Sequence, residues 1–439
     1  MPHQVAIEAA TTDVLHPYGV NITRILSHWF YRSLYLGSRS PSMHRYTRRV
    51  PELDAFISHP WAQSAGMKYF ALSLRYNCYS AYIITLLAAF LLSLLRVRAE
   101  AAIPLVWVML VLGMSGFGKL SIGQPMVFFD QFCIPQDDKN AMLEGIMNIG
   151  HYVERSKRLT VLWSREYNRR LWCMFELASF IKRRGISNVE ICPVAGAKVA
   201  LMLVNVSYLY LTFRFFFNLT AFDWIVDYTY SALYVIYWCF FYLPERCSMH
   251  RYFRTVDTKH LSCLKDSDRI MLMGRIEELY GSFTNFEDHV RDVFHRLQDQ
   301  WHSSAYVIRL LLVTTCPFVT VAILTGKIST ILSIVLLRVT LQVLLIILCD
   351  ASMKYGMRLS RWATAFCCLP LIVAHGELLR LAWKMGNFPQ DTTSPSVSFW
   401  ATAVVFVMVA IWVKRIIKPV KNVENSYDSW MCPEVSYGT

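Results

Sequence analysis

Eight long, nearly uncharged apolar runs constrain this chain more than any other feature of its sequence. They cover residues 79–95, 101–118, 199–220, 223–243, 305–325, 329–349, 362–383 and 397–413. Each run is about as long as the roughly 17–25 residues that a helix needs to cross a bilayer. Because lipid offers no hydrogen-bond partner to the backbone, these runs are expected to be transmembrane α-helices, about eight in total. The sequence therefore predicts an integral, multi-pass membrane protein whose first partner is the lipid bilayer.

The spacing of the runs predicts which side of the membrane each polar segment occupies. The runs form four close pairs, which predict transmembrane hairpins at 79–118, 199–243, 305–349 and 362–413. All long polar segments then lie on one side, and the short connections on the other side carry only four of the 44 Lys and Arg residues, namely Arg96, Arg98, Lys327 and Lys384. Since basic residues favour the cytoplasmic side, the polar segments and both termini are predicted to be cytoplasmic.

Charge and cysteine content exclude several other classes of protein. The formal net charge of +13 follows from this topology and from anionic lipid at the inner leaflet, so no nucleic-acid partner is expected. The twelve cysteines are scattered without any Cys-x-x-Cys pair. That distribution fits free thiols in a reducing compartment, and no metal site or disulfide framework is expected.

The polar segments alternate between strand and helix patterns. Buried strands are predicted in ELDAFISH (52–59), PMVFFD (125–130), RLTVLW (158–163) and NVEICPV (188–194). Helical spacing appears over 64–77, 140–156, the WCMFELASFIKRR stretch (172–184) and 267–298, where Gly281 is a candidate break. Such alternation implies an α/β domain with a doubly wound parallel sheet covered by helices.

The predicted domain is assembled from separate pieces of the chain. It combines 52–78, 119–198 and 245–303, and transmembrane hairpins interrupt it twice. A fifth strand is expected around HLSCL (260–264). Residues 1–50 lack sustained periodicity and are expected to be loosely ordered near the membrane surface, and 414–439 form a cytoplasmic tail.

Three motifs in this domain resemble those of the Toll/interleukin-receptor (TIR) family. LDAFISH resembles the opening D-x-F-I-S strand, VFFD resembles the second strand, and SREYNRRLWCMFEL resembles S-x-x-Y…W-C-x-x-E-L. The resemblance covers roughly 100 residues in the family's order, and the W-C-x-x-E-L block is its most specific part. It implies a flavodoxin-like sheet. The inserted membrane hairpins depart from the family's pattern.

The resemblance implies one of two functions. Some TIR domains cleave the nicotinamide–ribose bond of NAD, and the family's catalytic glutamate corresponds to Glu176. NAD would then be a substrate, and no cofactor is expected. The other function is that of a non-catalytic adaptor for signalling, which associates with itself or with other TIR-like domains through residues 131–139. In that case Glu176 near a helix start is stabilised simply by the helix dipole.

The remaining candidate site residues follow from the expected sheet. Ligands of doubly wound sheets bind beyond the carboxyl ends of the strands. The side chains expected there, or able to stack on a flat ring, are Ser58, His59, Trp61, Asp130, Ser164 and Trp172. A different function, that of a channel or transporter, is suggested by charged groups inside the apolar runs, Arg338 and Glu377 among them.

Overall fold

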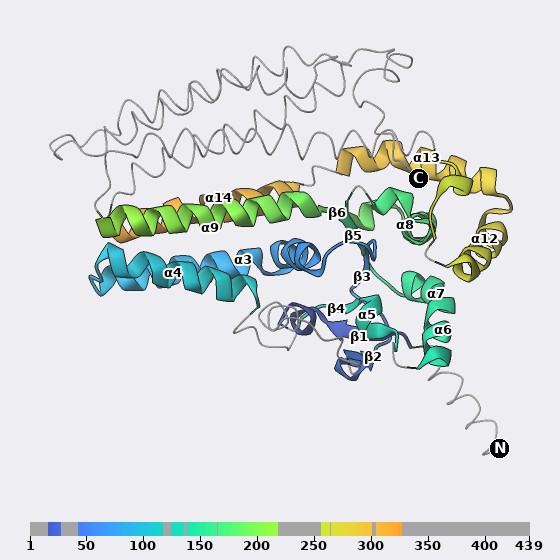
Figure 1. Ribbon diagram of the computed structural model, residues 1–439, viewed down its shortest axis with the longest axis horizontal. Coiled ribbons are helices and arrows are strands. Elements are labelled where there is room, and N and C mark those ends of the chain that lie inside the picture. Colours follow the sequence, from blue (N-terminus) through green and yellow to red (C-terminus); the bar gives the residue numbers. More distant parts are fainter. Residues whose placement is uncertain are drawn as a thin grey trace, which may run out of the picture. The chain divides into compact units, whose positions relative to one another are not determined.

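A computed structural model describes residues 16–27, 43–116, 124–135, 138–164, 166–217, 256–263, 265–300 and 304–326 (Figure 1). The chain divides into two compact units. The first unit draws on Met1–Asn77, Met114–Ala197 and Met249–Ile308. The second draws on Cys78–Gly113, Lys198–Ser248 and Arg309–Thr439.

The first unit is built on a mixed six-stranded sheet. Its strands are β1 (Tyr18–Asn21), β2 (Thr47–Arg49), β3 (Ala55–Ser58), β4 (Met126–Phe128), β5 (Leu159–Trp163) and β6 (Val189–Pro193). They lie in the order β2-β1-β4-β3-β5-β6. Strands β4, β3, β5 and β6 are mutually parallel. Strand β1 pairs antiparallel with both β2 and β4. Every residue of β3, β4 and β5 is buried, as expected for parallel strands covered on both faces.

The two antiparallel strands correct two expectations drawn from the sequence. The sheet is not wholly parallel, and two stretches within residues 1–50 form strands instead of remaining loosely ordered. Val20 is fully buried and lies opposite Val127 in the register. A Cβ atom at Gly19 would lie 2.8 Å from Leu53 Cδ2, so β1 packs closely against the side chain of Leu53. The strand sequences YGVN and TRR contain no short apolar run of the kind that marks β3 and β4, which is why the sequence did not reveal them.

Helices of the first unit follow the predicted pattern, including the predicted break at Gly281, and two expectations are corrected, one for a helix and one for a strand. They are α5 (Asp130–Cys133), α6 (Lys139–Met147), α7 (Ile149–Glu154), α8 (Leu171–Arg184), α12 (Asp266–Tyr280) and α13 (Phe283–Gln300), with short 3-10 turns η1 (Met43–Tyr46), η2 (Tyr167–Arg169), η3 (Ile186–Asn188) and η5 (Thr258–His260). The helix expected over 140–156 is interrupted at Asn148. The helix expected over 267–298 ends at Gly281, whose φ of 78° gives a left-handed cap. The expected fifth strand at 260–264 is only an isolated parallel bridge between Ser262 and Arg170.

The candidate membrane helices lie mainly in the second unit, although each of the three longest begins within the residues of the first. Three helices are long and apolar enough to cross a membrane, namely α3 (Ala65–Leu94), α9 (Val194–Phe217) and the Ala305–Thr325 part of α14 (Ser304–Thr325). The neighbouring α4 (Ala99–Met114) is apolar but shorter. Large apolar side chains such as Leu87 and Phe90 are more than half exposed on α3. These helices indicate membrane association, because lipid is the environment that such surfaces suit.

Four of the eight expected spans lie outside the described residues. They are 223–243, 329–349, 362–383 and 397–413, and the tail at 414–439 lies outside as well. Of the four expected spans within the described part, three belong to helices long enough to cross a membrane, whereas 101–118 corresponds to the shorter α4.

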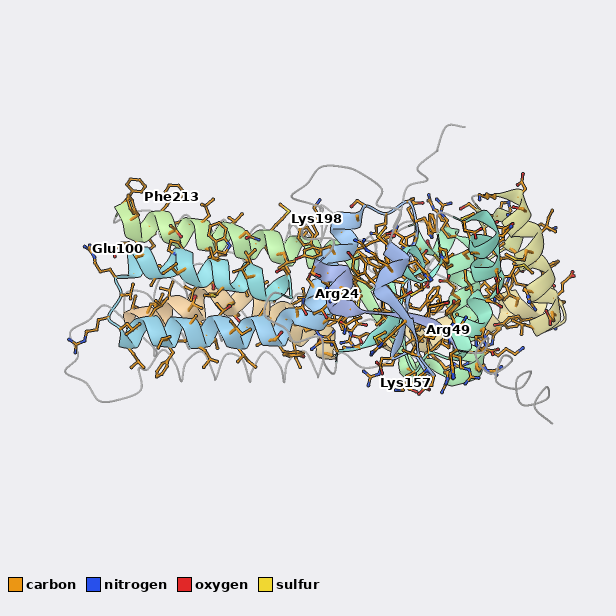
Figure 2. The ribbon with its side chains drawn as sticks, turned by 90° about the horizontal axis from the view of Figure 1, so that it is seen from below. Arg24, Arg49, Glu100, Lys157, Lys198 and Phe213 are labelled. Carbon is orange, nitrogen blue, oxygen red and sulfur yellow. The ribbon has the colours of Figure 1, made fainter. Side chains whose placement is uncertain are left out.

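Polar contacts join the helices of the second unit. Trp107 on α4 donates a 2.8 Å hydrogen bond from its indole nitrogen to Asn205 Oδ1 on α9. The hydroxyl of Tyr208 on α9 lies 3.2 Å from that of Thr320 on α14. Such bonds hold apolar helices together where hydrophobic burial contributes little. By contrast, Phe213 points outward from α9 (Figure 2).

Candidate functional site

A cavity of about 410 Å³ lies at the carboxyl ends of the parallel strands in the first unit. This volume is within the roughly 300–1,000 Å³ typical of small-molecule sites. Strands β3 and β5 both pack against helix α8, and Figure 1 shows these elements close together. The wall includes five residues expected from the sequence, namely His59, Trp61, Asp130, Trp172 and Glu176. The crevice expected for ligands of such sheets is therefore open in this protein.

Glu176 reaches the cavity from the second turn of α8 and is anchored by the end of β3. Its side chain is 9% exposed. The hydroxyl of Ser58 lies 2.5 Å from Glu176 Oε2 and 2.8 Å from the hydroxyl of Tyr167. Tyr167 in turn donates to the backbone carbonyl of Cys173, at 3.2 Å. A chain of three hydrogen bonds therefore runs from the carboxyl group to the helix backbone.

The number of protons in this chain depends on the charge of Glu176. Three contacts need three hydrogens, but Ser58 and Tyr167 together supply only two. A protonated Glu176 supplies the third, because it can donate to Ser58, which then donates to Tyr167. When Glu176 is ionised, Ser58 must donate to the carboxylate, and one of the other two contacts loses its hydrogen. Ionised Glu176 therefore leaves the chain one hydrogen short, although Ser58 is placed to donate to the carboxylate.

The electrostatics of the cavity favour a neutral carboxyl group at Glu176. Burial raises the pKa of Glu176 from its ordinary value of 4.5 to about 8, although the hydrogen bond from Ser58 opposes the rise. The negative charge of Asp130 raises this pKa further. Glu176 is consequently a proton-bearing group near neutral pH, and a nearby positive charge on a ligand would favour its ionisation.

Asp130 organises the other side of the cavity. It accepts a 2.5 Å hydrogen bond at Oδ2 from the indole nitrogen of Trp61, and its Oδ1 lies 3.5 Å from His59 Nε2. The His59 ring stacks on Phe129 with ring centroids 4.7 Å apart. Burial lowers the pKa of His59 from 6.5 to about 4, while Asp130 opposes that shift and Lys68 adds to it. His59 is therefore a neutral imidazole at physiological pH.

Two of the seven expected site residues do not line the cavity. Ser58 acts through its hydrogen bond to Glu176. Ser164 follows β5, and its buried hydroxyl has no hydrogen-bond partner among the described residues. Sequence reasoning did not predict Arg170, Cys173, Ser262, Cys263, Lys265 or Asp268, all of which line the cavity. The signal for Arg170 and Cys173 was their position beside Trp172, whereas nothing in the sequence linked 262–268 to this site.

Replacing Glu176 by Gln is expected to stabilise the folded protein at alkaline pH. Between pH 4.5 and about 8 the folded state binds the Glu176 proton more tightly than the unfolded state does. The stability that the folded state gains from this tighter proton binding is complete below the unfolded-state pKa of 4.5. It is lost as the pH rises through the folded-state pKa of about 8. At about 1.4 kcal/mol per pKa unit, ionised Glu176 costs the fold roughly 4–5 kcal/mol at pH 9, a cost that Gln does not carry.

The measurement is the melting temperature of the detergent-solubilised protein at pH 5 and pH 9. The Glu176→Gln variant should melt above the wild type at pH 9, and the two should converge at pH 5. The control is Glu144→Gln, since Glu144 is an exposed residue of α6 that lies outside the cavity. A difference between Glu176→Gln and the wild type that does not change with pH would contradict the assignment.

No family model, curated protein or solved structure matches this chain. The fold and its cavity define a class of protein. It is a membrane-associated chain with a mixed α/β unit, and that unit holds a ligand-sized cavity with a buried carboxyl group in its wall.

Proposed function

We propose that this protein is a membrane-anchored, TIR-like signalling protein that cleaves the nicotinamide–ribose bond of NAD. The observation that carries the proposal is the placement of Glu176, which is buried in the wall of a ligand-sized cavity and hydrogen-bonded to Ser58. The TIR-like motifs at 54–58, 128–130 and 164–177 meet at this cavity. Both the resemblance and the geometry therefore support Glu176 as the catalytic residue.

The strand order supports the proposal. In chain order, the four parallel strands lie as second, first, third and fourth. This is the beginning of the 2-1-3-4-5 order of flavodoxin-like sheets, whose ligands bind where the order reverses, between the first and third strands. Those strands are β3 and β5, and Ser58 ends the first of them, while the strand residues that line the cavity belong to β3 and β4.

The chemistry needs a carboxylate beside the ribose. As the bond from ribose C1′ to the nicotinamide nitrogen breaks, its electron pair leaves with nicotinamide and positive charge develops on the ribose. An ionised Glu176 stabilises that charge within a cavity of low polarity. Water then adds at C1′ and releases a proton, so the products are nicotinamide and ADP-ribose.

The positive nicotinamide ring of NAD is itself the charge that ionises Glu176. Its attraction lowers the pKa of the carboxyl group when substrate binds, and Ser58 is already placed to donate to the carboxylate. Trp61 and Trp172 in the wall offer aromatic faces for a flat cationic ring. Neutral His59 adds no opposing positive charge.

The test is release of nicotinamide from NAD by the purified, detergent-solubilised protein over a range of protein concentrations. Release that rises more steeply than the protein concentration would support both cleavage and self-association. No release from folded, self-associated protein would favour the adaptor function, in which substitutions within 131–139 disrupt association. The charged groups that suggest a transporter, Arg338 and Glu377, lie outside the described residues, and the cytoplasmic orientation remains part of the proposal.

A further inference from the structure

Two cations in the cavity wall have no role in the bond cleavage described above. Arg170 immediately precedes α8, and Lys265 immediately precedes α12. Among the described residues, neither side chain forms an ion pair with a carboxylate. The Nε atom of Arg170 is buried without a hydrogen-bond partner there, which is costly unless a ligand supplies an acceptor.

These two cations come from distant parts of the chain but are held together by the backbone. Ser262 donates its amide to the carbonyl of Arg169 at 2.7 Å, and its own carbonyl accepts from the amide of Leu171 at 3.1 Å. The guanidinium group of Arg269 donates to the carbonyls of Thr258 and Leu261, at 3.0 and 2.6 Å. The segment before α12 is therefore fixed against the start of α8. The part of the cavity wall that this segment forms is fixed with it.

The acidic residues of the wall leave these cations available to a ligand. Asp130 is engaged by Trp61, Asp268 accepts a 3.3 Å bond from Ser267, and Glu176 shares its hydrogen bond with Ser58. Helix α8 has no acidic residue in its first turn and no side-chain cap, so its amino end also favours an anion.

We infer that Arg170 and Lys265 form a subsite for the phosphate groups of a nucleotide, next to the pocket that holds the reacting ribose. Arg170 precedes Glu176 by six residues, which corresponds to about 9 Å along the helix axis. That separation leaves room for a ribose beside Glu176 and for its 5′-phosphate or diphosphate near Arg170. Guanidinium and ammonium groups both form strong charge-assisted bonds to phosphate oxygens.

This inference rests on the proposed function for the identity of the nucleotide, but it concerns binding and can be tested without turnover. The protein is the full chain in detergent carrying Glu176→Gln, so that NAD is not consumed. Calorimetry then compares its Kd for NAD, for ADP-ribose and for nicotinamide riboside, which has the reacting half of NAD without any phosphate. The parent is compared with variants that also carry Arg170→Gln or Lys265→Gln.

Each of these substitutions is expected to weaken binding of NAD and ADP-ribose about tenfold or more, because each removes a bond to a charged group. Binding of nicotinamide riboside should not change. Lys259→Gln is the matched control, since Lys259 belongs to the same segment but does not line the cavity. Lys265 is exposed, so its variant should fold even if the half-buried Arg170 proves necessary for folding.

Equal losses for NAD and for the riboside would overturn the inference, as would unchanged NAD binding in the Lys265→Gln variant. Failure of the parent to bind either NAD or ADP-ribose would overturn it as well. If the wild type releases no nicotinamide but the parent binds ADP-ribose through both cations, the phosphate subsite stands and the proposed cleavage fails.

Discussion

The Glu176→Gln variant is expected to release nicotinamide from NAD about a thousandfold more slowly than the wild type. Gln has nearly the same shape and can still contact Ser58, but it cannot carry the negative charge that opposes the developing charge on the ribose. Removing one well-placed electrostatic group from an active site costs about 10²–10³ in rate. Nicotinamide release by equal amounts of each protein, followed by chromatography, measures the difference.

The matched control for this loss is Glu144→Gln, which makes the same chemical change on an exposed part of α6. Its rate should equal that of the wild type. Folding of the Glu176→Gln variant is checked independently by its higher melting temperature at alkaline pH. A well-folded Glu176→Gln variant that retains the wild-type rate would assign cleavage to another group.

The second large effect expected is a steep rise of kcat/KM for NAD with pH. Because burial holds the pKa of Glu176 near 8 in the empty site, only a minority of the free protein carries the carboxylate at neutral pH. The value of kcat/KM reports the ionisation of the free enzyme, so it should increase about tenfold per pH unit below that pKa and level off above it. Between pH 6 and pH 8 the rise should be about fiftyfold.

Removal of the Ser58 hydroxyl tests the cause of this profile. Its hydrogen bond favours the ionised form of Glu176, so Ser58→Ala should move the midpoint of the kcat/KM profile to a higher pH. The plateau should be affected much less. A rate that falls as pH rises would mean that Glu176 acts in its protonated form, and it would contradict the electrostatic role proposed here.

Local patterns in the sequence determined several features that the structure reproduces. The buried strands at β3, β4, β5 and β6 follow from short apolar runs bounded by polar residues, and the break at Gly281 follows from the freedom of glycine at positive φ. The apolar helices α3, α9 and α14 follow from composition alone, because a backbone in lipid must satisfy its own hydrogen bonds. These features depend on neighbours in the chain, which the sequence displays directly.

Only the tertiary structure decided the edge of the sheet and the content of the cavity. Strands β1 and β2 form because Val20 is buried against an existing sheet, and neither strand contains an apolar run that would have predicted it. Arg170 and Lys265 share a wall only because backbone bonds at Ser262 join two distant segments. The protonation state of Glu176 could not be predicted from the sequence either. Its pKa reflects burial by many residues at once, and burial is a property of the folded chain, not of any local motif.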